Sequence, residues 1–454
     1  MRVEVLELTE YDDAFVSDDL VAAVDAEFWP KLGINVSRAP GQTMWRFRAD
    51  AFSGICRVKQ GDLDLTVVIQ PKLTGADTIF LAENAYGQRI DVLRRPKADR
   101  VALANSYSDP VAALLIWYVD AVSDFATRWL RRSYRSNQVT FHGSARGRFL
   151  VTKYVAQNLA TARSADVPCI VTERTIDTAN NRILKAGLRQ VAMLARALPS
   201  ARARRAVRHA VNSALPRFAE ASDVRVGPVQ RRAASTTGPN RHYKGILDTT
   251  VDLLAGHYLD QALGTTPTDS FLWVMPTLFQ EALRGILGQS GEIRLDASTR
   301  PSAQIFDAQG RRLTSSRVDP DYVLETDAGM LLLDAKYKDA LRLAAPDPSD
   351  ELLVGGDGPR IRVSRHDVYQ MVAYRQHSKW AHAAVALAYP VVLKQGEDLP
   401  APYEVRGFGA PVYLIFMDVG SNARTNLPSF VARVVSIASS ATSEASQLTL
   451  QASA

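Results

Sequence analysis

Two aspartates and a lysine lie close together in the segment 317–338, and their types and spacing are typical of a metal-dependent site. The pattern predicts a β-hairpin in which one short strand, Tyr322–Glu325, follows Asp321, and a buried strand, Met330–Leu333, leads into Asp334 and Lys336. Residues i and i+2 of a strand share a face, so Asp334 and Lys336 point the same way and the partner strand brings Asp321 beside them. Two carboxylates and an ammonium group are therefore expected to converge at the end of a core strand.

This combination has the chemistry of phosphodiester cleavage. The carboxylates of Asp321 and Asp334 and the carbonyl of Ala335 are hard oxygen ligands suited to Mg²⁺, with Mn²⁺ as an alternative. Such a metal stabilises the charge that develops at phosphorus and activates a bound water, which Lys336 can position or help to deprotonate. The competing interpretation is a surface hairpin with an ordinary Asp–Lys ion pair. The apolar run into Asp334 and the presence of Pro320 before Asp321 favour the catalytic interpretation.

A downstream motif supports the same interpretation. Gln370 and Tyr374 are four residues apart, so on a helix they share a face and can reach one phosphate or one metal shell. The helix expected over Thr277–Leu287 carries Glu281, a candidate third acidic ligand. The competing interpretation of Glu281 is an ordinary exposed helical glutamate.

The chain that must position these residues is too long for one compact domain. Its 454 residues, 46% hydrophobic and 22% charged, predict a soluble globular protein of two or three domains. Strand-like segments characterise residues 1–105, helical periodicity characterises 106–265, and helix and strand patterns alternate over 266–435. We therefore expect an α+β chain with a β-rich N-terminal region, a helical basic middle region, a C-terminal α/β domain and a flexible tail over 436–454.

The middle region contains a stretch without acidic residues. No Asp or Glu occurs between Phe125 and Ala165, and the following arginines fall within or beside that stretch: Arg128, Arg131, Arg132, Arg135, Arg146 and Arg148. One interpretation is a set of solvated helix faces whose charge is balanced elsewhere in the fold. The other is a surface that binds DNA phosphates or docks on an acidic partner.

Several motifs are missing from the sequence, and their absence narrows the function. No G-x-x-x-x-G-K-[ST] loop is present, so a nucleotide-driven motor must be supplied by another chain. With only Cys56 and Cys169, no disulfide framework can form. The first residues lack the order of a secretory signal, and the longest apolar run, Val111–Val119, is about half of a membrane span. We expect a cytoplasmic protein that has no membrane partner.

These motifs together resemble a known nuclease family. Pro320-Asp321, Asp334-Ala335-Lys336 and Gln370-x-x-x-Tyr374 match the PD-(D/E)xK superfamily in its RecB-like form. The residues around them resemble the McrC family, the nuclease subunits of McrBC modification-dependent restriction systems. The resemblance continues upstream in Ile69–Leu73, His142–Arg148 and Glu173–Lys185.

The resemblance implies a restriction-endonuclease-like fold for 266–435, Mg²⁺-dependent cleavage of double-stranded DNA, and a partner AAA+ GTPase of the McrB type. It also implies that residues 1–105 dock on the partner's hexameric ring and stimulate GTP hydrolysis. Where the family often has Glu after Leu-Phe, this sequence has Gln280, and Glu281 follows. The alternative is a non-catalytic subunit that only activates an AAA+ NTPase, but the intact Asp321, Asp334 and Lys336 favour the nuclease.

Overall fold

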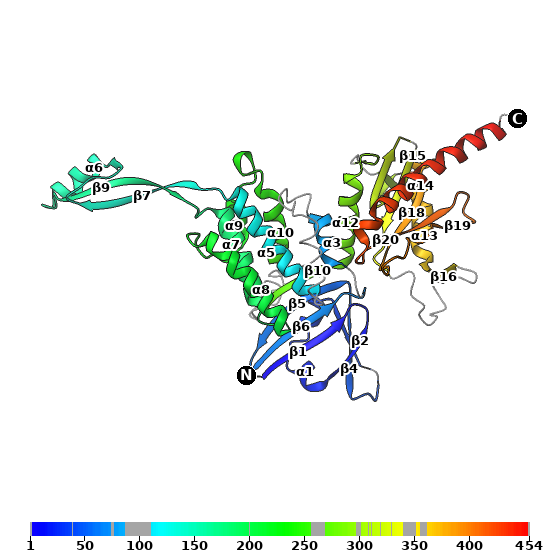
Figure 1. Cartoon of the computed structure of the whole chain (residues 1–454), viewed down its shortest axis with the longest axis horizontal. Helices are drawn as coiled ribbons and strands as arrows, with labels where there is room; N and C mark the ends of the chain where they lie inside the picture. Colours follow the sequence, from blue (N-terminus) through cyan, green and yellow to red (C-terminus); the bar gives the residue numbers. More distant parts are fainter. Residues whose placement is uncertain are drawn as a thin grey trace. The chain divides into compact units, whose positions relative to one another are not determined.

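The computed structural model describes residues 2–452 except 39, 74–76, 87–109, 199, 256–267, 297–300, 307, 310, 318, 328, 339–350 and 355–360 (Figure 1). Contacts divide the chain into two compact units, residues 1–88, 95–114 and 262–454, and residues 89–94 and 115–261. The predicted N-terminal and C-terminal regions therefore share one unit. In the part of the chain that the structure describes, none of the helices has the length and apolarity needed to span a bilayer.

The N-terminal region of the first unit is rich in strands. Its main sheet contains, in spatial order, β1 (Arg2–Thr9), β6 (Leu63–Gln70), β5 (Phe52–Gln60) and β10 (Thr268–Val274). β1 runs parallel to β6, and the other neighbours are antiparallel. A smaller sheet contains β2 (Asp13–Ser17), β4 (Met44–Ala49) and β3 (Ile34–Ser37), with α1 (Asp18–Ala22) and α2 (Phe28–Lys31) beside it in sequence. The fourth strand of the main sheet thus comes from the region predicted to be the nuclease domain.

The C-terminal region is built on a mixed six-stranded sheet. Its spatial order is β11 (Arg294–Leu295), β14 (Tyr322–Thr326), β15 (Gly329–Ala335), β18 (Ala384–Val391), β20 (Val412–Asp418) and β19 (Tyr403–Val405). β14 and β15 form the predicted antiparallel hairpin, and β15, β18 and β20 run parallel. β18 is buried along its whole length, as expected for an apolar strand covered on both faces. Two hairpins lie outside this sheet, β12 (Ser302–Phe306) with β13 (Arg312–Arg317) and β16 (Glu351–Val354) with β17 (Ile361–Ser364).

Three helices accompany this sheet: α12 (Met275–Gln289), α13 (Arg365–Arg375) and α14 (Ala423–Ala452). The sequence predicts a flexible tail over 436–454, and as far as residue 452 these residues continue α14. The segment is rich in Ser and Thr, but it also carries Ala, Leu and Gln and contains neither Gly nor Pro, so nothing in it stops the helix. A composition that is common in disordered tails is here compatible with a helix.

The two regions of the first unit pack tightly on each other. A Cβ atom added to Gly285 of α12 would lie 1.9 Å from the carbonyl oxygen of Asn84 in α3 (Thr78–Tyr86), so this crossing requires glycine. Arg424 of α14 pairs with Asp77 at 3.2 Å and with Glu83 at 2.8 Å. The β-rich region and the sheet of the C-terminal region therefore form one packed body.

The second unit combines helices with a long two-stranded ribbon. Its helices are α5 (Pro110–Trp129), most of which lies in this unit, α7 (Ala179–Leu194), α8 (Ala201–Ala214), α9 (Pro228–Ala233) and α10 (Tyr243–Ala255). The ribbon pairs β7 (Ser133–His142) with β9 (Asp166–Thr175), and β8 (Arg148–Phe149) adds a short third strand. Between β8 and β9 lie α6 (Val151–Lys153) and a wide helical turn, Tyr154–Leu159. Short 3₁₀ turns elsewhere in the chain occupy Leu215–Phe218, Gly238–Asn240 and Ser378–Trp380.

The ribbon corrects the prediction of a helical region over 106–265, because that region also contains β7, β8 and β9. We call residues 133–175 the arm, and within the second unit it extends away from the helices (Figure 1). Nearly every side chain of β7 is exposed. A strand that is exposed on both faces has no alternation of apolar and polar residues, so the usual sequence signal of a strand is absent. Here the backbone hydrogen bonds of the ladder, and not burial, define the strands.

Candidate active site

Asp321 and Asp334 lie side by side at the open end of the β14–β15 hairpin. Tyr322 pairs with Leu333, so the two aspartates are the next residues outward in this register. The backbone N–H of Asp321 donates to Oδ1 of Asp334 at 3.0 Å, and that of Ala335 donates to Oδ2 of Asp321 at 2.8 Å. The carboxylate of each aspartate is thus held by a backbone N–H group at or next to the other aspartate. The structure brings together the pair that the sequence predicts.

Lys336 completes the group. Its Nζ lies 2.8 Å from Oδ2 of Asp334 and 3.8 Å from Oδ1 of Asp367. Burial lowers the pKa of Lys336, but the carboxylates of Asp334, Asp367 and Asp321 outweigh burial and hold it above its ordinary value. Lys336 is therefore a charged donor at neutral pH. In this arrangement it can orient an oxygen and stabilise negative charge, but it cannot accept a proton.

Gln370 and Tyr374 extend the same network from α13. Lys336 Nζ donates to Oε1 of Gln370 at 3.2 Å, and Nε2 of Gln370 donates to the hydroxyl of Tyr374 at 2.6 Å. The Tyr374 hydroxyl in turn donates to the carbonyl of Asp319 at 3.2 Å, just ahead of Asp321. Burial, and then the charge of Asp334, raise the pKa of Tyr374. The predicted four-residue spacing therefore places both side chains on the face of α13 that meets the lysine.

The residue of α12 that contacts the aspartates is Gln280. Its Nε2 donates to Oδ1 of Asp321 at 2.6 Å, and its carbonyl accepts a hydrogen bond from the hydroxyl of Tyr322. Glu281, the predicted third acid, lies one position further, a turn of about 100° around the helix. It pairs instead with Arg284 at 3.6 Å. Glu281 therefore stays a weaker candidate ligand, and Gln280 takes the place that the sequence analysis gave to an acid.

The donor set fits a hard divalent cation. Burial, and then the charge of Asp334, raise the pKa of Asp321 from 3.8 to about 6. Burial and the neighbouring carboxylate both disfavour the charged form of Asp321, and a bound cation would offset both effects. In the described residues, no group of three or more His, Cys, Asp or Glu side chains gathers for a metal. The protein thus offers two carboxylates and the Ala335 carbonyl, and Mg²⁺ commonly keeps water in its remaining positions.

The Asp321→Asn variant is expected to be more stable than the wild type in the absence of metal. Because the pKa of Asp321 is raised to about 6, the folded chain binds its proton more tightly than the unfolded chain between pH 3.8 and 6. The protonated carboxyl group therefore contributes its full stability below pH 3.8, and this contribution is lost as the pH rises through 6. Asparagine can still accept from Ala335, and the Gln280 amide can rotate to accept from its NH₂ group. At pH 7.5 with EDTA we expect a gain of about 3 kcal/mol, most of which is lost near pH 4.

Thermal unfolding of Asp321→Asn and wild type at the two pH values measures this difference. Asp327→Asn, in the exposed turn of the same hairpin, is the control and should match the wild type at both. A variant at position 321 that is less stable than the wild type at pH 7.5 would show that the carboxylate pair is not strained.

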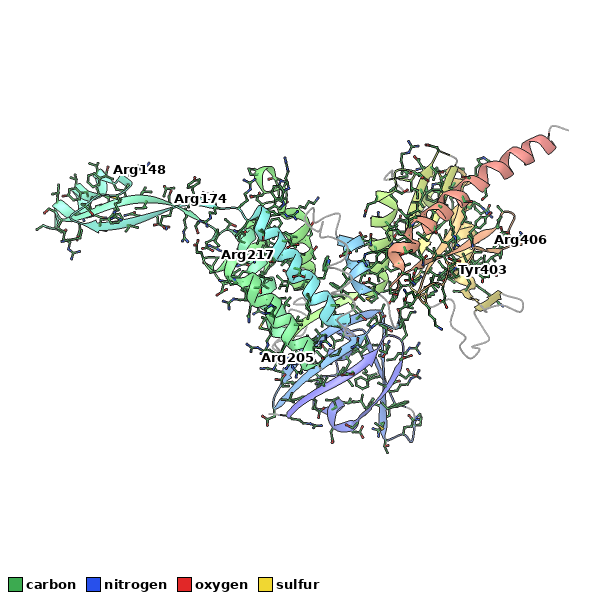
Figure 2. All side chains as sticks on the ribbon, viewed as in Figure 1. Arg148, Arg174, Arg205, Arg217, Tyr403 and Arg406 are labelled. Carbon is green, nitrogen blue, oxygen red and sulfur yellow. The ribbon has the colours of Figure 1, made fainter. Side chains whose placement is uncertain are left out.

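The predicted contact arginines lie at the end of α5 and on the arm. Arg128 is in the last turn of α5, Arg131 and Arg132 lead into β7, and Arg135, Arg146 and Arg148 belong to the arm. All six are exposed, and Arg148 is among the side chains labelled on the arm in Figure 2. Arg135 lies 3.7 Å from Asp177 but remains 60% exposed. The structure thus displays these cations on the surface of one unit, remote in sequence from Asp334.

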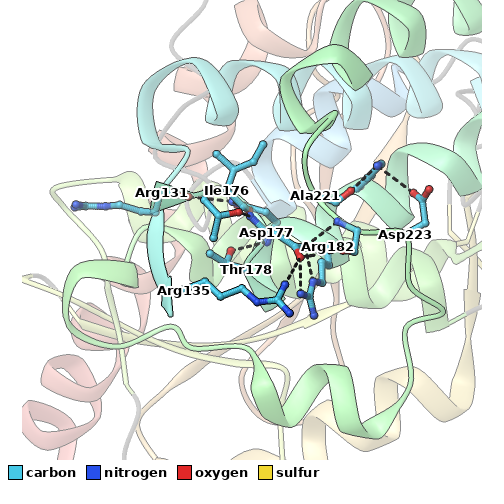
Figure 3. A network of polar contacts seen from close by, with 12 residues as sticks. Arg131, Arg135, Ile176, Asp177, Thr178, Arg182, Ala221 and Asp223 are labelled. Atoms are coloured by element: carbon cyan, nitrogen blue, oxygen red, sulfur yellow. Dashed lines mark hydrogen bonds and ion pairs between the residues drawn. The ribbon is translucent and has the colours of Figure 1, made fainter. Parts of the chain in front are cut away.

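A network of polar contacts fixes the base of the arm (Figure 3). Asp177 accepts two hydrogen bonds from Arg182, at 2.6 and 2.7 Å, and two from Ser222, at 2.7 and 2.9 Å. These bonds, that of Arg182 first, hold the pKa of Asp177 well below its usual range. The buried amide of Asn181 donates to the carbonyls of Arg131 at 3.0 Å and Ile176 at 2.7 Å, which lie at the two ends of the arm. One asparagine therefore ties both strands to α7.

The Asn181→Ala variant tests this anchor. Asn181 also accepts from the hydroxyl of Tyr243 at 2.7 Å, so the change removes three hydrogen bonds of a buried side chain. We expect α7 to lose about 3 kcal/mol of local stability, as measured by hydrogen exchange of its amides. The exposed Asn212 of α8 supplies the control substitution, Asn212→Ala, which should leave the exchange unchanged. Equal exchange in the two variants would mean that Asn181 does not hold the arm.

The comparisons with known proteins agree with this architecture. A family model described as "McrBC 5-methylcytosine restriction system component" matches residues 47–390. The chain belongs to this family. Among curated proteins, none matches the chain.

Solved structures supply two similar chains from McrBC assemblies. One is in the refined half-complex from a tetradecameric assembly of Thermococcus gammatolerans McrB AAA+ hexamers with bound McrC. It has 15% identity and a TM-score of 0.56, and the alignment covers 94% of this chain and 99% of that one. The other is in the cryo-EM structure of the Thermococcus gammatolerans McrBC complex, with 14% identity, a TM-score of 0.38, and coverage of 63% and 87%. At such identities the first likeness concerns the fold alone, and the second supports no argument.

Two functional candidates of this McrBC-family chain were missed or given no role by the sequence analysis. Asp367 is 4% exposed and accepts from Lys338 at 2.5 Å, beside Lys336. It precedes Gln370 by three residues and Tyr374 by seven, so helical periodicity alone places it on the same face. For Gln280 the sequence gives a weaker indication, namely that it occupies the position where the family often has glutamate.

Proposed function

We propose that this chain is the DNA endonuclease subunit of a McrBC-like restriction complex, with a PD-(D/E)xK active site formed by Asp321, Asp334 and Lys336. The observation that carries the proposal is the convergence of these three side chains at the end of β15. Backbone N–H groups fix both carboxylates, so the site is organised before the substrate arrives. Catalysis of phosphoryl transfer depends mainly on such positioning and on electrostatic stabilisation.

Mg²⁺, or Mn²⁺ in its place, would be held by Asp321, Asp334 and the carbonyl of Ala335. When bound, it supplies charge stabilisation at phosphorus and an activated water. Lys336 then orients the attacking oxygen and stabilises the negative charge of the phosphate. Gln370 holds the Lys336 amine from the side of α13, and Tyr374 holds Gln370. Double-stranded DNA is the proposed substrate. Its candidate phosphate contacts, or contacts to the partner, are Arg128, Arg131, Arg132, Arg135, Arg146 and Arg148.

The proposed partner is an AAA+ GTPase of the McrB type, and the arm is its proposed docking element. In the similar solved assembly, McrB AAA+ hexamers have McrC bound. The apolar side chains Val151, Val155 and Leu159 at the tip of the arm are 57%, 53% and 50% exposed. A cluster of exposed apolar residues with arginines around it is typical of an interaction surface. This proposal assigns docking to the arm, whereas the sequence analysis assigned it to residues 1–105.

Cleavage of methylated and unmethylated plasmid, with and without the candidate GTPase, GTP and Mg²⁺, tests the proposal. We expect cutting only when the chain, the partner, the nucleotide and the metal are all present. Faster GTP hydrolysis without any cutting would instead identify a regulatory subunit that activates the motor.

A further inference from the structure

A buried polar cluster touches the strand that ends in Lys336, and the proposed chemistry does not use it. Its members are Glu10, Tyr11 and Lys72 of the N-terminal region and Tyr337, the residue after Lys336. Nζ of Lys72 donates to the carbonyl of Tyr337 at 3.3 Å. The hydroxyl of Tyr337 donates to Oε2 of Glu10 at 3.4 Å, and the backbone N–H of Lys72 donates to the same oxygen at 3.0 Å. We call these four residues the clasp.

Glu10 is an unusual residue to find inside the protein. It has no exposed surface, and in the described structure its Oε1 has no hydrogen-bond partner. Burial raises the pKa of this carboxyl to about 7, against the opposing effect of Lys72. A buried carboxyl group opposes folding unless it is bonded, so a core built only for packing would carry an apolar residue here.

Tyr11 shows that the backbone is also constrained at this place. Its φ is +60°, in the left-handed region that residues other than glycine rarely adopt. This conformation puts its ring 4.8 Å from Nζ of Lys72, which also lies 5.4 Å from the ring of Tyr337. Strained backbone persists where surrounding contacts require it, and such places are often functional. The clasp thus combines strain, a buried acid and a lysine enclosed by two rings.

The clasp holds the segment that directly follows the end of β15. β15 stops at Ala335, and among the residues described as far as Lys338, the last backbone bond to the sheet runs from the N–H of Lys336 to the carbonyl of Ala388, at 2.8 Å. Beyond it, the N–H of Lys338 bonds back to the carbonyl of Lys336 at 2.9 Å, which turns the chain. Beyond this bond, the polar contacts that hold Tyr337 come from Glu10 and Lys72 of the N-terminal region, and its ring lies near that of Phe279 of α12, with 6.1 Å between the centroids.

We propose that Glu10 and Lys72 are positioning residues that hold Tyr337, and through it Lys336, in the geometry needed for cleavage. The inference rests on the proposed nuclease function. It also gives a role to Lys72 in the Ile69–Leu73 segment, which the nuclease chemistry leaves unexplained. The N-terminal region is then a part of the active-site scaffold and more than a neighbour of it.

The test compares Lys72→Met with Lys59→Met in the full chain. Methionine keeps the apolar stem of Lys72 but removes the donor to Tyr337. Lys59 is a half-exposed lysine of β5 with only a 4.0 Å ion pair to Asp64, so it is the matched control. For Lys72→Met we expect faster amide exchange in residues 336–338 and about a tenfold lower kcat for plasmid cleavage. The KM for DNA and the stimulation of the partner's GTPase should not change, and Lys72→Arg should restore part of kcat.

The outcomes separate the clasp from the nuclease proposal. If wild type does not cleave DNA, the proposed function fails, but amide exchange at 336–338 still decides whether the clasp holds this segment. Exchange and kcat equal to those of Lys59→Met would overturn the inference. If Lys72→Met does not fold, Tyr337→Phe carries the test, because it removes only the hydroxyl that bonds Glu10. It is expected to increase exchange at 336–338, and unchanged exchange would count against the clasp.

Discussion

Replacing Asp334 by asparagine is expected to abolish DNA cleavage and to leave activation of the partner GTPase intact. Asp334 is 2% exposed, accepts from the backbone of Asp321 and pairs with Lys336 at 2.8 Å. Asparagine can keep the bond to the Asp321 backbone, but it is a poor ligand for Mg²⁺ and leaves Lys336 without its closest anion. Loss of several kcal/mol of charge stabilisation corresponds to a decrease in rate of roughly 10³-fold.

The measurement is single-turnover plasmid cleavage with partner, GTP and Mg²⁺, accompanied by GTP hydrolysis in the same mixture. Asp327→Asn makes the same chemical change in the exposed turn of the hairpin and should cleave like wild type. Near-normal cutting by Asp334→Asn would remove this residue from the active site and leave the regulatory interpretation standing.

Changing Val151, Val155 and Leu159 together to serine is expected to abolish both GTPase stimulation and partner-dependent cleavage. Each of these side chains is at least half exposed at the tip of the arm. Burying them against a partner is the expected source of favourable free energy for docking. Central apolar contacts in interfaces are each worth about 1–2 kcal/mol, so the triple change should weaken binding about 10²–10⁴-fold. Binding of Mn²⁺ at the aspartates, measured by calorimetry, should not change.

The control for the arm is Val229→Ser. Val229 is 74% exposed on α9, in the same unit but outside the arm, so its substitution should leave partner binding intact. If the triple variant stimulates the partner like wild type, docking lies elsewhere, and residues 1–105 become the next region to test. Both the arm variant and the Asp334 variant should fail to cleave, but only the arm variant should also lose GTPase stimulation, which separates docking from chemistry.

The sequence predicts the local parts of the site well, because they depend on short periodicities. The i, i+2 rule for strands puts Asp334 and Lys336 on one face, and the i, i+4 rule for helices does the same for Gln370 and Tyr374. The sequence predicts poorly the features that depend on residues far apart in the chain. β10 pairs with β5, which lies about two hundred residues earlier, and no local pattern records that pairing. The choice between Gln280 and Glu281 depends on the rotation of one helix, which only packing decides.

The pairing of β10 with β5 has a consequence for how this chain can be divided. A fragment that begins at β10 would keep the aspartates but take that strand away from β5, which becomes an unpaired edge in the remaining part, and bare edges invite aggregation. A fragment of the N-terminal region alone would lack its fourth strand. The N-terminal and C-terminal regions of this protein therefore cannot be exchanged independently of each other. Recombination or engineering that exchanges one of them must carry residues 268–274 along with the N-terminal sheet.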